Sequence, residues 1–117
     1  MAESRPSIKI FVNTEFQQLE AFYSVFFGIE EEGIPYEVVN SEERNSVKLA
    51  YNAALTSRLD VGLGIGADGS IIMHYAKLKE NTPLFKSNFR AEESDLRMFG
   101  ANAARLVKGM PFKSEGE

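Results

Sequence analysis

The stretch from Val61 to Tyr75, VGLGIGADGSIIMHY, decides the fold. Its two ends, residues 61–66 and 70–75, are apolar and rich in β-branched residues, which is typical of strands. Between them Asp68-Gly69 is a strong two-residue hairpin signal, so the two strands should pair antiparallel. The glycines at 62, 64 and 66 share one face of the first of these strands. They would allow another segment to pack very closely there.

Strand and helix patterns alternate before this hairpin. Residues 7–12 (SIKIFV) suit a first strand. A helix is expected from about Glu15 to Glu32, because residues 14–17 have capping-box spacing and Gly33 can end the helix. Residues 35–39 are expected to form a short second strand. The buried face predicted for the next helix consists of Val47, Ala50, Tyr51, Ala54 and Leu55.

The segments after the hairpin complete the predicted fold. Residues 83–85 suit a short edge segment, and a last helix should run from near Ser94 to Gly109. The order β-α-β-α-β-β-α predicts an α/β protein with one compact domain, in which helices pack on the faces of a mixed sheet of four to five strands. We expect residues 7–113 to form this domain and residues 1–6 to form a flexible tail.

Composition narrows the classes of function. The chain has 117 residues, a formal net charge of −4 and a pI near 5.1, which argues against the basic face of a nucleic-acid-binding protein. No apolar run approaches the roughly 20 residues that span a membrane. There are no cysteines, so thiolate metal sites and thiol nucleophiles are excluded. We expect a cytoplasmic protein.

Three candidate catalytic or cofactor motifs carry little weight. Residues 64–69 match the G-x-G-x-x-G pattern of phosphate loops, but a strand pattern follows where that motif needs a helix. His74 is the only histidine and is better interpreted as a structural strand residue. No pair of acids clearly converges for hydrolysis. The residues therefore predict no catalytic site and no cofactor site of the chain's own.

The segment Gly28 to Pro35 (GIEEEGIP) places three glutamates where the first helix should end. Each exposed acid in a last turn opposes the helix dipole by about 0.3–1 kcal/mol. Either the helix end is simply solvated, or an external cation, from a metal or from a partner's Lys or Arg, offsets the repulsion. Helical spacing selects Glu31 as the acid that would reach a docked partner.

Glu31 shares a helix face with three small residues, Ala21, Ser24 and Gly28. Gly28 is either a tolerated glycine near a helix end or part of a shallow strip that another backbone approaches. The second alternative predicts that Ala21, Ser24, Gly28 and Glu31 dock a partner. Mg²⁺ and Ca²⁺ require about six oxygen ligands, so a metal bound by Glu31 would be shared across an interface.

Four segments together resemble a known family. They are GIEEEGIPY (28–36), HYAKL (74–78), PLF (83–85) and GANAARLVKGMPF (100–112), in the family's order and at about its spacing. The family is the small subunit of diol/glycerol dehydratase-reactivating factors, which is related to the medium (β) subunit of adenosylcobalamin-dependent dehydratases. The resemblance covers most of the chain from about Gly28 to Phe112.

The resemblance implies a chaperone-like protein without catalysis of its own. In this family the small subunit docks on a large subunit with an actin-like ATPase fold. It can exchange with the dehydratase β subunit, so that damaged cobalamin is released. The middle glutamate of the family motif, here Glu31, would help to hold a divalent cation (Mg²⁺ or Ca²⁺) bound mainly by the large subunit. Association with a bacterial microcompartment is a further implication.

Two other hypotheses stay open at this point. The chain could be a dehydratase medium subunit or a fragment of one, although such subunits are longer. It could also be a separate nucleotide-binding domain that uses residues 64–69.

Overall fold

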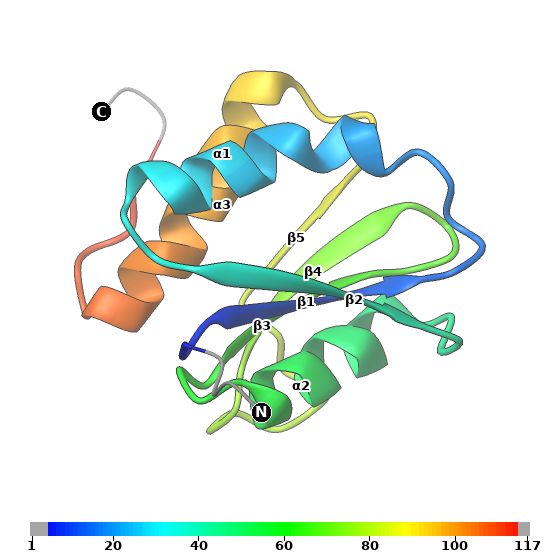
Figure 1. Cartoon of the computed structure of the whole chain (residues 1–117), viewed down its shortest axis with the longest axis horizontal. Helices are drawn as coiled ribbons and strands as arrows, with labels where there is room; N and C mark the ends of the chain where they lie inside the picture. The colour runs from blue at the N-terminus through cyan, green and yellow to red at the C-terminus, as the bar shows by residue number, and fades with distance from the viewer. Residues whose placement is uncertain (1–4, 115–117) are drawn as a thin grey trace.

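The computed structural model describes residues 5–114, which form a five-stranded mixed sheet with helices on both faces (Figure 1). The strand order is β2-β1-β3-β4-β5, where β1 is parallel to both of its neighbours and the β3–β4 and β4–β5 pairs are antiparallel. This confirms the predicted α/β fold. The strands are β1 (Ile8–Asn13), β2 (Tyr36–Ser41), β3 (Val61–Ile65), β4 (Ser70–Tyr75) and β5 (Phe85–Asn88).

The hairpin between β3 and β4 forms as predicted. Ile65 pairs with Ile71, and Gly69 takes a positive φ of 84° in the connecting turn. The predicted edge segment 83–85 is displaced, because strand β5 begins only at Phe85.

Helix α2 (Ser46–Thr56) covers the face of the sheet on which the β3 glycines lie (Figure 1). A Cβ at Gly62 would lie 2.2 Å from the backbone nitrogen of Ala54, and one at Gly64 would lie 2.3 Å from that of Ala50. The close packing predicted for these glycines is therefore confirmed, and its partner is α2. One predicted core residue of this helix is wrong, because Leu55 is 54% exposed.

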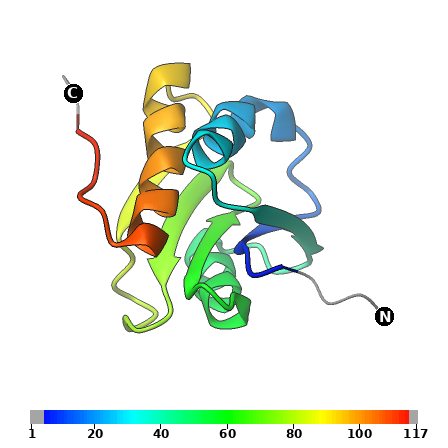
Figure 2. The ribbon, with the colours of Figure 1, turned by 60° about the vertical axis from the view of Figure 1, so that its left-hand side comes forward.

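Helices α1 (Tyr23–Glu31) and α3 (Glu93–Lys108) lie together over the opposite face, as Figure 2 shows. The last helix ends as predicted at Gly109, which has a φ of 71°. Helix α1 contributes four residues to the core between the helices and the sheet. They are Phe22 at the N-cap, Val25, Phe26 and Ile29. Two aromatic residues of α1, Tyr23 and Phe27, lie outside this core and are half exposed.

The first helix begins later than the capping-box spacing predicts. The side chain of Asn13 accepts a hydrogen bond from the backbone nitrogen of Glu15 at 2.9 Å, and the carbonyl of Asn13 accepts one from Phe16. These bonds close a turn at residues 13–16, so the chain enters a short 3₁₀ helix, η1 (Leu19–Phe22), before α1. The helix end is close to the prediction: Gly33 has a φ of 80°, and its nitrogen donates to the carbonyl of Glu30 at 2.9 Å.

Residues 1–4 of the predicted N-terminal tail lie outside the described residues, and Arg5 and Pro6 are exposed. Within residues 5–114, none of the helices combines the length and the apolar character needed to cross a membrane.

Candidate interaction site at the end of helix α1

The carboxylate of Glu31 is paired within the chain. Arg97 on α3 donates from Nε to Oε1 of Glu31 at 2.9 Å, and its Nη2 pairs with Oε2. The hydrogen bond from Arg97 lowers the pKa of Glu31 below its ordinary value. Both side chains remain about half exposed. A cation that offsets the charge of Glu31 is thus present on this chain's own α3 helix.

Glu32 is paired even more fully. Lys108 donates to both its Oε1 and its backbone carbonyl at 2.8 Å, and Arg105 donates to Oε2 at 3.3 Å. The Glu32 side chain is only 14% exposed, and the bond from Lys108 is the main cause of its lowered pKa. Cations of α3 therefore offset the unfavourable dipole interaction of Glu31 and Glu32, and neither sequence alternative describes these two acids.

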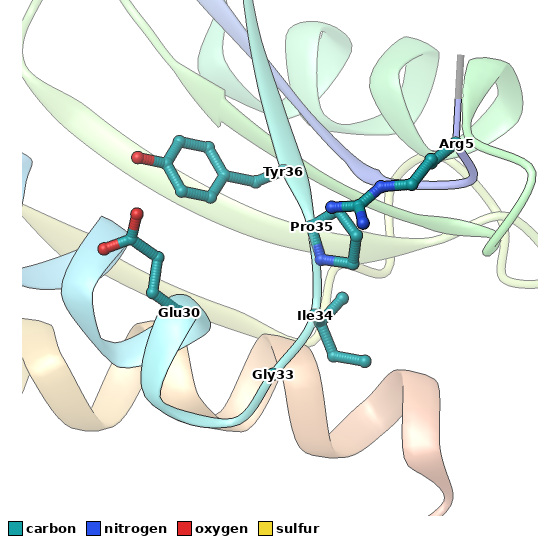
Figure 3. A pocket seen from close by; sticks show the side chains of 6 residues that line it. All are labelled: Arg5, Glu30, Gly33, Ile34, Pro35 and Tyr36. Carbon is teal, nitrogen blue, oxygen red and sulfur yellow. The ribbon is translucent and has the colours of Figure 1, made fainter. Parts of the chain in front are cut away.

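Glu30 differs from both neighbours. Within residues 5–114 no ion pair or hydrogen bond reaches its carboxylate, and the side chain is exposed. Figure 3 shows it beside the ring of Tyr36, at the edge of a cavity of about 610 Å³. Burial raises the pKa of Tyr36, and the negative charge of Glu30 raises it further. The residues lining this cavity are Arg5, Glu30, Gly33, Ile34, Pro35 and Tyr36.

Gly28, one of the three small residues predicted to dock a partner, packs against another helix of the same chain. A Cβ at Gly28 would lie 2.1 Å from the carbonyl oxygen of Arg97, and one at Gly100 would lie 1.9 Å from that of Val25. The backbone that approaches Gly28 is therefore that of α3, which corrects the docking prediction for this residue. Ala21 and Ser24 are half-buried and Glu31 is exposed.

Sequence reasoning missed the cations that pair with the glutamates. Arg97, Arg105 and Lys108 lie on one side of α3, because their spacings of eight and three residues keep them within less than a quarter-turn of one another. This periodicity was a usable signal for a basic stripe. What the sequence did not reveal is that the stripe crosses the end of α1.

The other motifs have structural roles. Residues 66–69 lead into β4, so the loop lacks the helix N-terminus that phosphate binding would use. His74 is fully buried, donates from Nε2 to the carbonyl of Glu80 at 2.9 Å and packs against Tyr51. Among the described residues, no three His, Asp or Glu side chains gather to hold a metal.

Comparisons with known proteins identify the family of the chain. The family model "Dehydratase medium subunit" matches residues 5–113. The propanediol dehydratase-reactivating factor small subunit of Citrobacter freundii is 37% identical over 92% of this chain and 90% of its own. The corresponding protein of Salmonella typhimurium is 38% identical over 94% of this chain and 92% of its own.

Two solved structures share the fold closely. A glycerol dehydratase reactivase superposes with a TM-score of 0.91 at 30% identity, covering 94% of this chain and 98% of that one. A diol dehydratase-reactivating factor complexed with ADP and Mg²⁺ superposes with a TM-score of 0.87 at 36% identity. This match covers 95% of this chain and 100% of that one. Similarity therefore extends beyond residues 28–112, through the N-terminal third. The chain belongs to the dehydratase medium subunit family, among the small subunits of dehydratase-reactivating factors.

Proposed function

We propose that this chain is the small subunit of a reactivating factor for an adenosylcobalamin-dependent diol or glycerol dehydratase. It docks on a large ATPase subunit and performs no catalysis itself. The observation that carries the proposal is the similarity to reactivating-factor small subunits along nearly the whole of both chains. The cytoplasm, in association with a bacterial microcompartment, is the proposed location.

Subunit exchange is the proposed mechanism. The family model that matches this chain is named after the dehydratase medium subunit, so one fold serves the reactivating factor and the enzyme. A chain that presents the backbone surface of the enzyme's β subunit can take its place against a large subunit. Exchange with that subunit would open the inactivated dehydratase and let damaged cobalamin leave. Such a function lies in the shape of an interface and not in a pocket.

We further propose that Glu31 contributes to a divalent cation site shared with the large subunit. Its carboxylate is exposed, and the pair with Arg97 lies at the surface, where such pairs are weak and can exchange. A lone carboxylate cannot satisfy Mg²⁺ or Ca²⁺, so the other ligands would come from the partner and from water. The Mg²⁺ in the related diol dehydratase-reactivating factor complex supports this proposal.

Co-purification with the large subunit tests both parts. The wild-type chain should capture the large subunit, and the complex should contain a divalent cation measurable by mass spectrometry. Glu31→Gln should lower the metal content or weaken the complex. Glu15→Gln is the matched control, because Glu15 is also in an exposed arginine pair, with Arg44.

Two outcomes would contradict these proposals separately. A chain that binds a dehydratase large subunit stably, but no ATPase subunit, would refute the role in reactivation. An unchanged metal content and affinity in Glu31→Gln would remove Glu31 from the metal site and leave the docking role intact.

A further inference from the structure

A second cavity, of about 240 Å³, lies between the exposed side of α1 and the start of β2. Four of its lining residues are aromatic and the fifth is a carboxylate. They are Tyr23, Phe26, Phe27, Glu30 and Tyr36. This composition differs from that of the larger neighbouring cavity, which has one aromatic residue and more polar walls (Figure 3).

Three of the four rings in this aromatic pocket, those of Tyr23, Phe26 and Tyr36, are in contact through Phe26. Tyr36 stacks on Phe26 with ring centroids 5.1 Å apart and an interplanar angle of 20°. The ring of Tyr23 is tilted against that of Phe26, with the centroids 6.1 Å apart. Phe26 itself belongs to the core, so it anchors both tyrosines. This part of the pocket therefore rests on a residue of the core.

Two of these aromatic side chains are exposed at a cost. Tyr23 is 50% exposed and Phe27 is 51% exposed, although each would gain free energy from burial. Clustered exposed aromatic residues are enriched at binding sites, where tyrosine in particular anchors a partner. These two side chains flank Glu30, which is the chain neighbour of Glu31, the residue at which the proposed function places the partner.

Charge determines what the pocket can bind. Arg97 pairs with Glu31, and Arg105 and Lys108 pair with Glu32. Among the residues that the structure describes, Glu30 therefore has the one unpaired carboxylate of the three. Arg5 lies along the same larger cavity, but within residues 5–114 no hydrogen bond or ion pair joins it to Glu30. Aromatic faces and a carboxylate both attract a cation, so their combination selects positive charge.

We propose that this aromatic pocket binds an arginine side chain of the partner subunit. A guanidinium can stack on the tyrosine and phenylalanine faces while it donates two parallel hydrogen bonds to Glu30, which a compact ammonium cannot do. The inference rests on the proposed function only for the identity of the partner, the large subunit. The preference for a guanidinium rests on the pocket alone.

Small probes test the pocket without the partner. N-acetyl-arginine amide, titrated into the full chain at constant ionic strength, should shift the ring resonances of Tyr23, Phe27 and Tyr36. The uncharged citrulline analogue should not. Glu30→Gln should remove most of the arginine-induced shift, whereas Glu80→Gln, the same change in an exposed loop residue, should leave it unchanged. Three results would each overturn the proposal that the pocket binds a guanidinium: equal shifts with citrulline, no shift with arginine, or an undiminished shift in Glu30→Gln.

Binding to the large subunit tests the occupant. Glu30→Gln and Phe27→Ala should each raise the Kd by roughly tenfold, the size expected for a desolvated cation site, and Glu80→Gln by less than about twofold. Unchanged affinity in both pocket variants would overturn the proposal that the partner's arginine occupies the site. If the wild-type chain does not bind the large subunit at all, the proposed function fails, and the probe titration still decides whether the pocket takes a guanidinium.

Discussion

Glu31 and Arg97 form a bidentate ion pair that joins the last turn of α1 to the first half of α3 across 66 residues of sequence. Arg97 also makes the contact in which its backbone meets Gly28. One residue of α3 thus supplies both the carbonyl that needs a glycine and the guanidinium that neutralises a glutamate.

Removal of this guanidinium should raise the pKa of Glu31. The bond from Arg97 is the main cause of the lowered value, so in Arg97→Ala the pKa should return toward its ordinary value of 4.5. Carboxyl-carbon NMR titration measures this directly. Arg44→Ala, which removes a similar charge from Glu15, should leave Glu31 unchanged. An equally low pKa of Glu31 in Arg97→Ala would show that the pair does not persist in solution.

Gly28→Ala should destabilise the chain strongly. The added Cβ would overlap the carbonyl of Arg97, so α1 and α3 would have to separate, and overpacking of this kind costs about 1–3 kcal/mol. Urea unfolding measures the loss. Gly33→Asn is the control, because nothing lies within 4 Å of a Cβ there and asparagine tolerates a positive φ. A Gly28→Ala variant as stable as Gly33→Asn would contradict the helix crossing.

Gly64→Ala should weaken the packing of α2 on the sheet and so destabilise the chain. Its Cβ would meet the backbone of α2 at Ala50 and Ser46, which cannot move aside as a flexible side chain could. We expect a loss of about 1–3 kcal/mol in the free energy of unfolding. Leu55→Ala, on the exposed side of the same helix, should change it by less than about 0.5 kcal/mol. Similar losses in the two variants would be evidence against backbone contact between α2 and β3.

Asp68 should make stability depend on acid pH. The backbone nitrogen of Ser70 donates to its Oδ1 at 2.9 Å, which is the largest cause of its lowered pKa, and the Ser70 hydroxyl adds to it. Because the folded pKa lies below the unfolded one, the unfolded chain binds more protons there, so stability is lost as the pH falls below about 4.

Asp68→Asn tests this dependence through urea unfolding at several pH values. The variant should be less stable than the wild type at neutral pH, and the difference should shrink as the pH falls below about 4. A constant difference across that range would show that the pKa of Asp68 is not lowered in the folded chain. Glu31 and Glu32 also have lowered pKa values, so some acid dependence should remain in the variant.

Much of the fold was predictable because its signals are local. Alternation of apolar residues predicted β3 and β4, and Asp68-Gly69 predicted their pairing. The last helix was predicted to run from near Ser94 to Gly109, and α3 runs from Glu93 to Lys108 with Gly109 as its C-cap. The start of α1 was not predictable in this way, because Thr14 and Asn13 offer competing local hydrogen bonds and the turn at Asn13 forms instead.

The sequence by itself determined the α/β class, the family and the unusual charge of the GIEEEGIP segment. Only the tertiary structure decided what each of its glutamates does: Glu31 and Glu32 meet cations of α3, whereas Glu30 stays unpaired in an aromatic pocket. Helical periodicity predicts which face of α1 an acid occupies, but it does not predict which helix packs against that face. That choice is made by the packing of Gly28 against α3, a contact between residues far apart in the chain.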